Sequence, residues 1–419
     1  MTGRLSHPFI TPGANDIFAT LDVTANSTPE RRRVPVNLAL VIDRSGSMAG
    51  AKIEHARRAA LQLVELLSEA DRLAIVHYGN DVTTLGGRLA TAENKRVMRD
   101  FISHIAQEGG TNIGEALVAG QAELVVAQSD FRVNRLLLLS DGQPTVGITE
   151  PRGLVSVATR LRNAGVSVTA LGVGADFNED LMQALADAGG GSYGFIKDPP
   201  STVALFERDL KQAGTLVARR ASVGFTLPQG VRFIEVYGRP ASQAGARVTI
   251  ALPDFSAEQR EKVVVHLSVT PSAGEGTADV GAFELGYEDV LAGGGGAARV
   301  SLAAAVTTDT TVAQSRRDKE AVVLAAKAQA AANYQHAAVA LDRGDFASAQ
   351  AVLKGNSALL EEAEGLAGKG AVADERAANA AVDAMAAQAP AASEEARRTS
   401  VKMMKVQSLK SAGRGASAY

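Results

Sequence analysis

The sequence predicts a multi-domain α/β + β + α protein. A doubly wound, Rossmann-like α/β domain is inserted in a β-sandwich, and an Ala-rich helical region follows. Residues 34–216 alternate strand-like and helix-like hydrophobic patterns, which is typical of a parallel sheet with crossover helices. Residues 217–311 contain short alternating runs separated by Gly, Pro and Ser, which is typical of a sandwich. Residues 312–411 are Ala-rich with helical spacing, and residues 412–419 form a tail.

The α/β domain is expected to alternate strands and helices over its whole length. The expected strands are Val36–Ile42, Asp71–Tyr78, Val82–Leu89 (at an edge of the sheet), Arg135–Ser140, Val166–Gly172 and Ser192–Ile196. The expected helices are Lys52–Ser68, Asn94–Ile105, Ile113–Ala127, Pro151–Asn163, Asn178–Ala188 and Ser201–Leu216. Pro151 at the start of one helix and Gly165 after its end are typical helix boundaries.

The sandwich is expected to use strands from both sides of the α/β domain. After the domain, the expected strands are Val217–Leu227, Val231–Val236, Arg247–Leu252, Lys262–Thr270, Ala278–Tyr287 and Ala297–Val306. Within residues 1–33, Ile17–Val23 alternates apolar and polar side chains but has no local hairpin mate. We therefore expect Ile17–Val23 to join the later strands.

The C-terminal region is expected to be helical. The expected helices are Ser315–Leu341, one that begins at Asp345, Val372–Gln388 and Ala391–Val406. Gly344 ends the first helix, Asp345 caps the second, and Pro390 separates the last two. The chain has no acidic residue after Glu395 but several basic ones. This basic end could contact nucleic acid, but a solvated helix end is the simpler explanation, so we do not expect a nucleic-acid partner.

The composition limits the classes of function. The chain has 419 residues, a formal net charge of −3 and no cysteine. The small charge gives no global field that favours nucleic acid or a membrane. The lack of cysteine excludes disulfides, thiolate metal sites and thiol catalysis. The N-terminal residues have no apolar signal-peptide stretch, and no run approaches the roughly 18 apolar residues of a membrane helix, so we expect a cytoplasmic protein.

The stretch from Val36 to Ser47 predicts a ligand site. Its apolar run is typical of a strand buried on both faces, and it ends in Asp43, Ser45 and Ser47. Open α/β sheets bind their ligands at the carboxyl ends of the strands. A carboxylate and two hydroxyls are hard oxygen donors, which favour Mg²⁺, Mn²⁺ or Ca²⁺ over Zn²⁺. The motif alone is a weak signal, because Ser-Gly-Ser also commonly caps a helix, such as the one expected over Lys52–Ser68.

Two later stretches strengthen the metal-site hypothesis. Gly109–Asn112 places the Thr111 hydroxyl just before an expected helix, and Asp141 follows a second buried strand. Together with the Asp-x-Ser-x-Ser stretch, they resemble the von Willebrand factor A (VWA) family and its metal-ion-dependent adhesion site, over about residues 34–212. The loop Leu139–Gly147 is similar to that of inter-alpha-trypsin inhibitor heavy chains and of bacterial relatives.

The resemblance implies a metal site made of Asp43, Ser45, Ser47, Thr111 and Asp141. The three hydroxyl side chains would contact Mg²⁺ directly, or Mn²⁺ or Ca²⁺ in its place, and the two aspartates would act mainly through water. The last coordination position would be left for an Asp or Glu of a partner protein. Cytoplasmic members of the family often work beside AAA+ ATPases, which implies a partner of that kind.

The sequence favours a binding protein over an enzyme. Its six histidines are scattered without an H-E-x-x-H motif, and no general base accompanies the two serines. We therefore expect a divalent-metal-dependent protein–protein interaction module that binds an acidic residue of its partner. Two alternatives stay open: a metal-dependent phosphohydrolase, and a structural scaffold whose helical C-terminus binds the partner.

Overall fold

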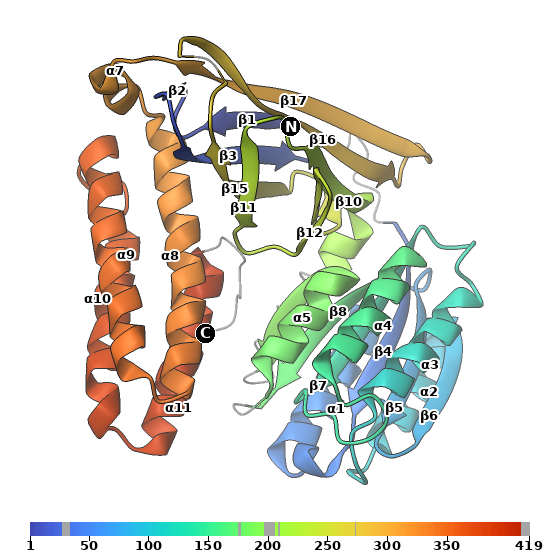
Figure 1. Ribbon diagram of the computed structural model, residues 1–419. Coiled ribbons are helices and arrows are strands. Elements are labelled where there is room, and N and C mark those ends of the chain that lie inside the picture. Colours follow the sequence, from blue (N-terminus) through green and yellow to red (C-terminus); the bar gives the residue numbers. More distant parts are fainter. Residues whose placement is uncertain (27–33, 175–176, 197–205, 208–209, 273, 412–419) are drawn as a thin grey trace.

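The structure, a computed structural model, describes residues 1–26, 34–174, 177–196, 206–207, 210–272 and 274–411. It has three parts (Figure 1): an α/β part, a pair of β-sheets next to it, and a bundle of helices. Within the described ranges, none of the helices combines the length and the apolar character that a membrane crossing requires.

A six-stranded sheet forms the centre of the α/β part, in the order β6-β5-β4-β7-β8-β9. Its strands are β4 (Val36–Asp43), β5 (Arg72–Tyr78), β6 (Val82–Leu89), β7 (Val133–Ser140), β8 (Val166–Val173) and β9 (Gly190–Ile196). Neighbouring strands are parallel except for β6, which runs antiparallel to β5 at the edge. The doubly wound α/β fold is therefore confirmed.

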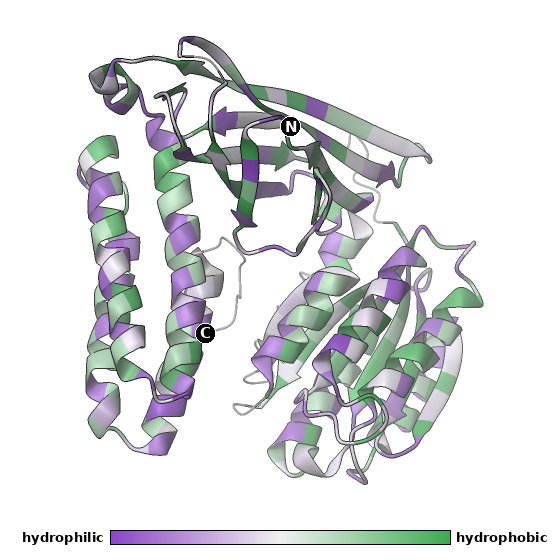
Figure 2. Cartoon of the chain, in the orientation of Figure 1, coloured by the Kyte–Doolittle hydropathy of each residue, from purple (hydrophilic) through white to green (hydrophobic). Residues whose placement is uncertain are grey.

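Helices cover both faces of this sheet. They are α1 (Ala51–Leu66), α2 (Ala92–Ser103), α3 (Ile113–Val125), α4 (Pro151–Asn163) and α5 (Glu179–Gly189). In β4, Leu38 and Leu40 lie in the core formed with α1 and α2, whereas Ala39 and Val41 lie in the core formed with α3, α4 and α5. All residues of β4 are thus buried, which explains its nearly continuous apolar run. Figure 2 shows mainly hydrophobic residues along the sheet and a mixture of hydrophilic and hydrophobic residues on the helices around it.

The helix expected over Ser201–Leu216 lies partly outside the described residues. Phe206, Leu210 and Ala213 are described, and they are buried in the core beside α1. Leu216 does not end a helix but begins a strand, because it pairs with Ser256 of a later strand.

The second part of the molecule consists of two β-sheets. One has the order β1 (Thr2–Leu5), β3 (Asn15–Thr24), β15 (Arg260–Val269) and β11 (Val231–Val236). The other has the order β12 (Ala241–Ala244), β13 (Arg247–Ala251), β10 (Leu216–Thr226), β16 (Gly276–Asp289), β17 (Gly295–Val306) and β2 (Phe9–Ile10), and β14 (Phe255–Ser256) pairs with β10. Both sheets contribute to one hydrophobic core, in which Leu21 and Val265 of the first lie with Phe225 and Phe283 of the second.

The N-terminal strand β3 belongs to the same sheet as strands that follow the α/β part. It pairs antiparallel with β15 from Asn15, opposite Val269, to Thr24, opposite Arg260. The chain enters and leaves the α/β part at neighbouring points, since Val34 N donates to Gly214 O at 2.9 Å. The expectation that Ile17–Val23 pairs with a strand from residues 217–311 agrees with this register.

The third part is a helical bundle of α7 (Thr310–Ser315), α8 (Lys319–Asp342), α9 (Phe346–Ala367), α10 (Ala373–Gln388) and α11 (Glu394–Ser411). The prediction of one helix from Ser315 was wrong. Ser315 ends α7, and a new helix begins at Lys319 because the Asp318 side chain caps it by accepting from Ala321 N. Helix α8 packs against β3 and β15. Helix α11 reaches the α/β part, where Lys405 pairs with Asp180 of α5 at 2.7 Å.

We predict that Leu21→Ala lowers the free energy of unfolding by about 2–5 kcal/mol, because the side chain is fully buried between the two sheets. Urea unfolding followed by circular dichroism measures the change. Asp22→Ala, an exposed position on the same strand, is the matched control and should change stability by less than about 0.5 kcal/mol. Equal, small effects of both substitutions would show that β3 is not part of this core.

Candidate metal centre

The predicted site residues lie at one edge of the six-stranded sheet. Asp43 is the last residue of β4, and Asp141 directly follows β7. The two strands are parallel neighbours in which Ile42 lies opposite Leu139, so both carboxylates emerge at the same end. This is the carboxyl edge, where open α/β sheets bind ligands. It is the edge away from the junction at Val34, because β4 begins next to that junction and ends here.

Asp43 is completely buried, and hydrogen bonds from several donors hold its carboxylate. Oδ1 accepts from Ser45 N at 2.9 Å, and Oδ2 accepts from Ser140 Oγ at 2.6 Å and from Tyr78 OH at 3.2 Å. Burial raises the pKa of Asp43 to about 6, the hydrogen bonds oppose this rise, and the negative charge of Asp141 adds to it. The hydrogen bonds thus hold the Asp43 carboxylate in position, while burial and the charge of Asp141 disfavour its ionised form.

Ser45 and Ser47 lie in the turn that follows β4. Their hydroxyl oxygens are 3.1 Å apart, with Ser45 buried and Ser47 exposed. The alternative that these serines cap the next helix is not supported, because the N-cap of α1 is Gly50 and no side chain caps that end. Gly50 has a φ of +71°, which an L-residue rarely adopts. Because neither serine caps α1, the hydroxyl oxygens of Ser45 and Ser47 can act as ligands of a metal ion.

Thr111 is buried in the loop before α3, and neighbouring loops hold it in place. Its N–H donates to Thr145 Oγ1 at 2.9 Å, and its carbonyl accepts from Thr145 N at 3.0 Å and Val146 N at 3.2 Å. The same loop contacts the serine turn, since Gly46 N donates to Gly109 O at 2.9 Å. The three predicted stretches therefore meet, although they are far apart in the sequence.

Asp141 is completely buried, and its two carboxylate oxygens differ. Oδ2 accepts from Lys52 Nζ at 3.2 Å, whereas Oδ1 has no hydrogen-bond partner among the described residues. A buried acceptor without a partner is costly, so a ligand at this position would be stabilising. Two carboxylates and three hydroxyls suit a hard divalent cation, so the residues fit the ion that the family resemblance implies. Across the described residues, no group of three or more His, Cys, Asp or Glu side chains could hold a metal, so an ion here needs the hydroxyls.

Sequence reasoning missed three side chains that build the site: Ser140, Tyr78 and Lys52. Ser140 links the two carboxylate loops, because its Oγ donates to Asp43 and accepts from Gly142 N at 2.9 Å. Tyr78 ends β5 directly opposite Asp43, a register that the sequence does not reveal. Burial, with the nearby charge of Asp43, raises the pKa of Tyr78, so its hydroxyl stays a donor.

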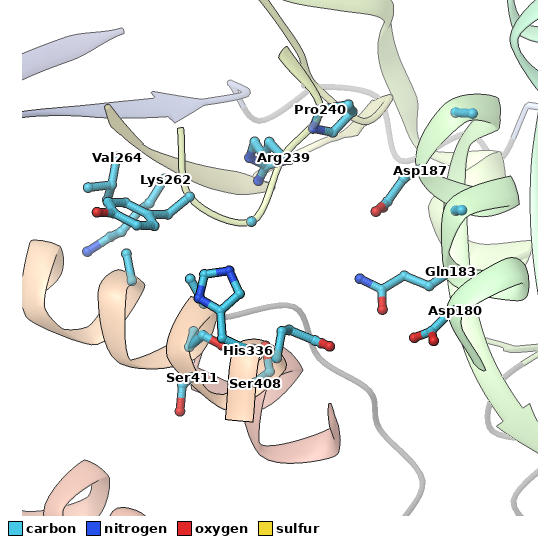
Figure 3. A pocket seen from close by; sticks show the side chains of 18 of the residues that line it. Asp180, Gln183, Asp187, Arg239, Pro240, Lys262, Val264, His336, Ser408 and Ser411 are labelled. Carbon is cyan, nitrogen blue, oxygen red and sulfur yellow. Dashed lines mark hydrogen bonds between the residues drawn. The ribbon is translucent and has the colours of Figure 1, made fainter. Parts of the chain in front are cut away.

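A separate cavity of about 530 Å³ lies between α5, the β11–β12 connection, α8 and α11 (Figure 3). Asp180 and Asp187 of α5 are on one side of it, and Arg239 and His336 are on the other. None of the five predicted site residues lines it. The cavity and the candidate metal centre are therefore distinct.

The fold and the site together define a class: a doubly wound α/β domain with an oxygen-rich cluster at the carboxyl edge of its sheet. Residues 37–208 match the sequence profile of the von Willebrand factor type A domain, and the chain contains such a domain. The chain is 26% identical over 286 residues to an uncharacterized Synechocystis sp. protein. The aligned region covers 65% of this chain and 66% of that protein. The chain is also 33% identical over 165 residues to inter-alpha-trypsin inhibitor heavy chain H4 of Homo sapiens. This alignment covers 38% of this chain and 18% of the heavy chain.

Two solved structures resemble the whole chain. A von Willebrand factor type A protein from Catenulispora acidiphila has a TM-score of 0.72 at 18% identity, with 97% of this chain and 96% of that chain covered. A paralog of ArnB from Sulfolobus acidocaldarius has a TM-score of 0.58 at 18% identity, with 97% of each chain covered. At this identity the likeness concerns the fold alone, and it extends beyond the VWA domain to the sheets and the helical bundle.

We predict that the Asp43 carboxyl makes the metal-free protein less stable as the pH rises. Its pKa is about 6 in the folded protein and 3.8 ordinarily, so the folded state binds more protons between these values. Stability should fall through this window, by on the order of 2–3 kcal/mol relative to Asp43→Asn. Urea unfolding in EDTA from pH 4 to pH 8 measures the difference between the two proteins, with Asp22→Asn as an exposed control. If the free energy of unfolding of the wild type and of Asp43→Asn changed with pH in parallel, the raised pKa of Asp43 would be contradicted.

Proposed function

We propose that the chain is a divalent-metal-dependent protein-binding module. One Mg²⁺, or Mn²⁺ or Ca²⁺ in its place, binds at the carboxyl edge of the sheet and captures an Asp or Glu side chain of a partner protein. VWA domains commonly mediate protein–protein interaction, which supports the class of function. The observation that supports metal binding is the buried Oδ1 of Asp141, which has no hydrogen-bond partner within the described part of the chain and lies near a second buried carboxylate, that of Asp43.

The proposed ligands follow from the donors at this edge. Ser45, Ser47 and Thr111 offer neutral hydroxyl oxygens, and Asp43 and Asp141 supply the negative charge, directly or through water. The ion would neutralise two carboxylates that are buried close together. An ion with mostly neutral direct ligands keeps much of its positive charge, so it attracts a further carboxylate.

We favour binding over the alternative of a metal-dependent phosphohydrolase. Hydrolysis would need a base near the ion, and His77, beside the end of β4, does not serve as one. Its ring lies 5.3 Å from that of Phe101 on α2, and burial lowers its pKa to about 4. We propose residues 34–216 as the binding domain, with the two sheets and the helices as its support. An AAA+ ATPase is a proposed partner on the family resemblance alone.

The first prediction of this proposal is that the protein binds one Mg²⁺ or Mn²⁺ per chain. Binding should raise the free energy of unfolding by about 2.7 kcal/mol at an ion concentration one hundred times the dissociation constant. Isothermal titration calorimetry and thermal melting measure the two effects. Asp43→Ala should abolish both without unfolding the protein, whereas Asp22→Ala should change neither. A flat titration with wild-type protein would remove the basis of the site.

The second prediction separates metal binding from partner binding. Thr111→Ala removes one neutral ligand and leaves both carboxylates, so the affinity for Mg²⁺ should fall less than the affinity for an acidic ligand. A peptide with a single glutamate is the probe, and its glutamine counterpart is the control. Both affinities are measured on the same variant. Equal losses of both affinities in Thr111→Ala would mean that Thr111 only helps to hold the ion. Unfolding of Asp43→Ala would instead favour the structural-scaffold alternative.

A further inference from the structure

We propose that the helical bundle positions one carboxylate loop of the metal centre, through ion pairs between α11 and the first turn of α5. The inference rests on the proposed function, because it concerns the affinity of the same site for its ion. It makes Lys402 and Lys405, two of the basic residues near the C-terminal end, positioning residues that act on the site through another helix.

The first two turns of α5 pack directly against the loop that follows β7. The N–H of Asn178, the N-cap of α5, donates to the carbonyl of Asp141 at 2.8 Å. A Cβ at Gly142 would lie 3.2 Å from the Cβ of Asn178 and 3.1 Å from the Cγ of Met182. Contacts this close leave α5 little room to shift without moving the loop. The start of α5 therefore determines where the Asp141 carboxylate emerges.

The two acidic residues that follow this N-cap pair with α11. Lys405 Nζ lies 2.7 Å from Asp180 Oδ2 and 3.9 Å from Glu179 Oε2. Lys402 Nζ lies 3.7 Å from Glu179 Oε1. The side chains of Glu179 and Lys405 are each only 16% exposed, so their interaction is screened less than that of an open surface pair.

The opposite side of α11 belongs to the bundle. Val401 and Met404 are buried in the bundle core, and Ser408 Oγ donates to Ala331 O of α8 at 2.7 Å. Val401 and Met404 are each followed by a lysine that pairs with α5. Helix α11 is thus anchored on α8 and presents its lysines to the α/β part.

The lysines stabilise a half-buried charge at the start of α5. Burial raises the pKa of Glu179, and the charges of Lys402 and Lys405 oppose this rise. Without the lysines, this turn would hold a poorly hydrated carboxylate that has lost two counter-charges, which is costly. We expect the turn to rearrange toward solvent, and the Asp141 loop to follow because the two are in close contact. The centre would then hold its ion less well.

Replacing both lysines by glutamine tests this inference. Lys402→Gln combined with Lys405→Gln should weaken Mn²⁺ binding roughly three- to tenfold, within the range found for residues that couple two sites. An effect of charge alone has the opposite sign, because removing two cations would strengthen the binding of a cation. Calorimetry measures the affinity, and circular dichroism checks the fold. Arg398→Gln is the matched control, since Arg398 is a cation of α11 that pairs with Glu394 of the same helix.

A reversed ion pair gives a second test. Lys405→Asp replaces an attraction to α5 by a repulsion, so it should weaken Mn²⁺ binding at least as much as the glutamine variant. Adding Asp180→Lys restores opposite charges across the contact and should return the affinity to within about twofold of wild type. A direct effect of charge predicts the reverse order of affinities. The swapped pair keeps the net charge of the chain, and it carries the test if the glutamine variant fails to fold.

The bound ion should in turn stabilise the contact with α11, because coupling between sites is reciprocal. Saturating Mn²⁺ should slow amide hydrogen exchange in α11 of the wild-type protein, and it should do so less in the glutamine variant. Mass spectrometry of the exchanged peptides measures this protection. A purely structural role of the lysines would leave the exchange of α11 independent of the ion.

The outcomes separate the alternatives. Weaker Mn²⁺ binding in the glutamine variant, recovery in the swapped pair and protection of α11 by the ion support the inference. Unchanged or tighter Mn²⁺ binding in the glutamine variant overturns it and leaves the proposed function standing. A loss of affinity that the swapped pair does not recover also overturns it. Failure of the wild-type protein to bind Mn²⁺ overturns the proposed function and this inference with it.

Discussion

The candidate site depends on the parallel pairing of β4 with β7. Because Ile42 lies opposite Leu139, Ser140 is level with Asp43, and Asp141 follows one position later at the same end of the sheet. A shift of one residue in this register would turn the Ser140 side chain to the face opposite Asp43. Ser140 reinforces the register, since its hydroxyl bridges the Asp43 carboxylate and the Gly142 N–H. The serine turn after β4 and the loop of Thr111 complete the site whose carboxylates β4 and β7 position.

The site is arranged at the expense of local stability. Two carboxylates are fully buried close together: that of Asp43 has a raised pKa, and that of Asp141 has an oxygen to which none of the described residues donates a hydrogen bond. Such groups persist only where the surrounding structure holds them firmly. Here the firm surroundings are the two cores that sandwich the six-stranded sheet. The cluster is the kind of local weakness that binding of a cation would relieve.

Much of the α/β part could be predicted from the sequence, because strands buried on both faces are mostly apolar runs that end at polar residues. Asp43 and Asp141 stand out for that reason. Tyr78 and Lys52 could not be found, since their approach to these aspartates depends on the pairing of β5 and on the packing of α1. The break before α8 was missed because a single capping residue, Asp318, outweighs a continuous helical pattern. The short strands β2 and β14 were missed because their pairing is set by distant partners, β17 and β10.

The neighbouring points at which the chain enters and leaves the α/β part have a further consequence. The hydrogen bond from Val34 N to Gly214 O closes this segment at its base. For the two sheets, the whole segment then behaves like a surface loop whose ends already meet. Closing such a loop costs entropy that grows only with the logarithm of its length. The sheets can therefore carry a large domain between Thr24 and Leu216 with little more entropic cost than a short connection, and the α/β part can change in size without changing how its carrier folds.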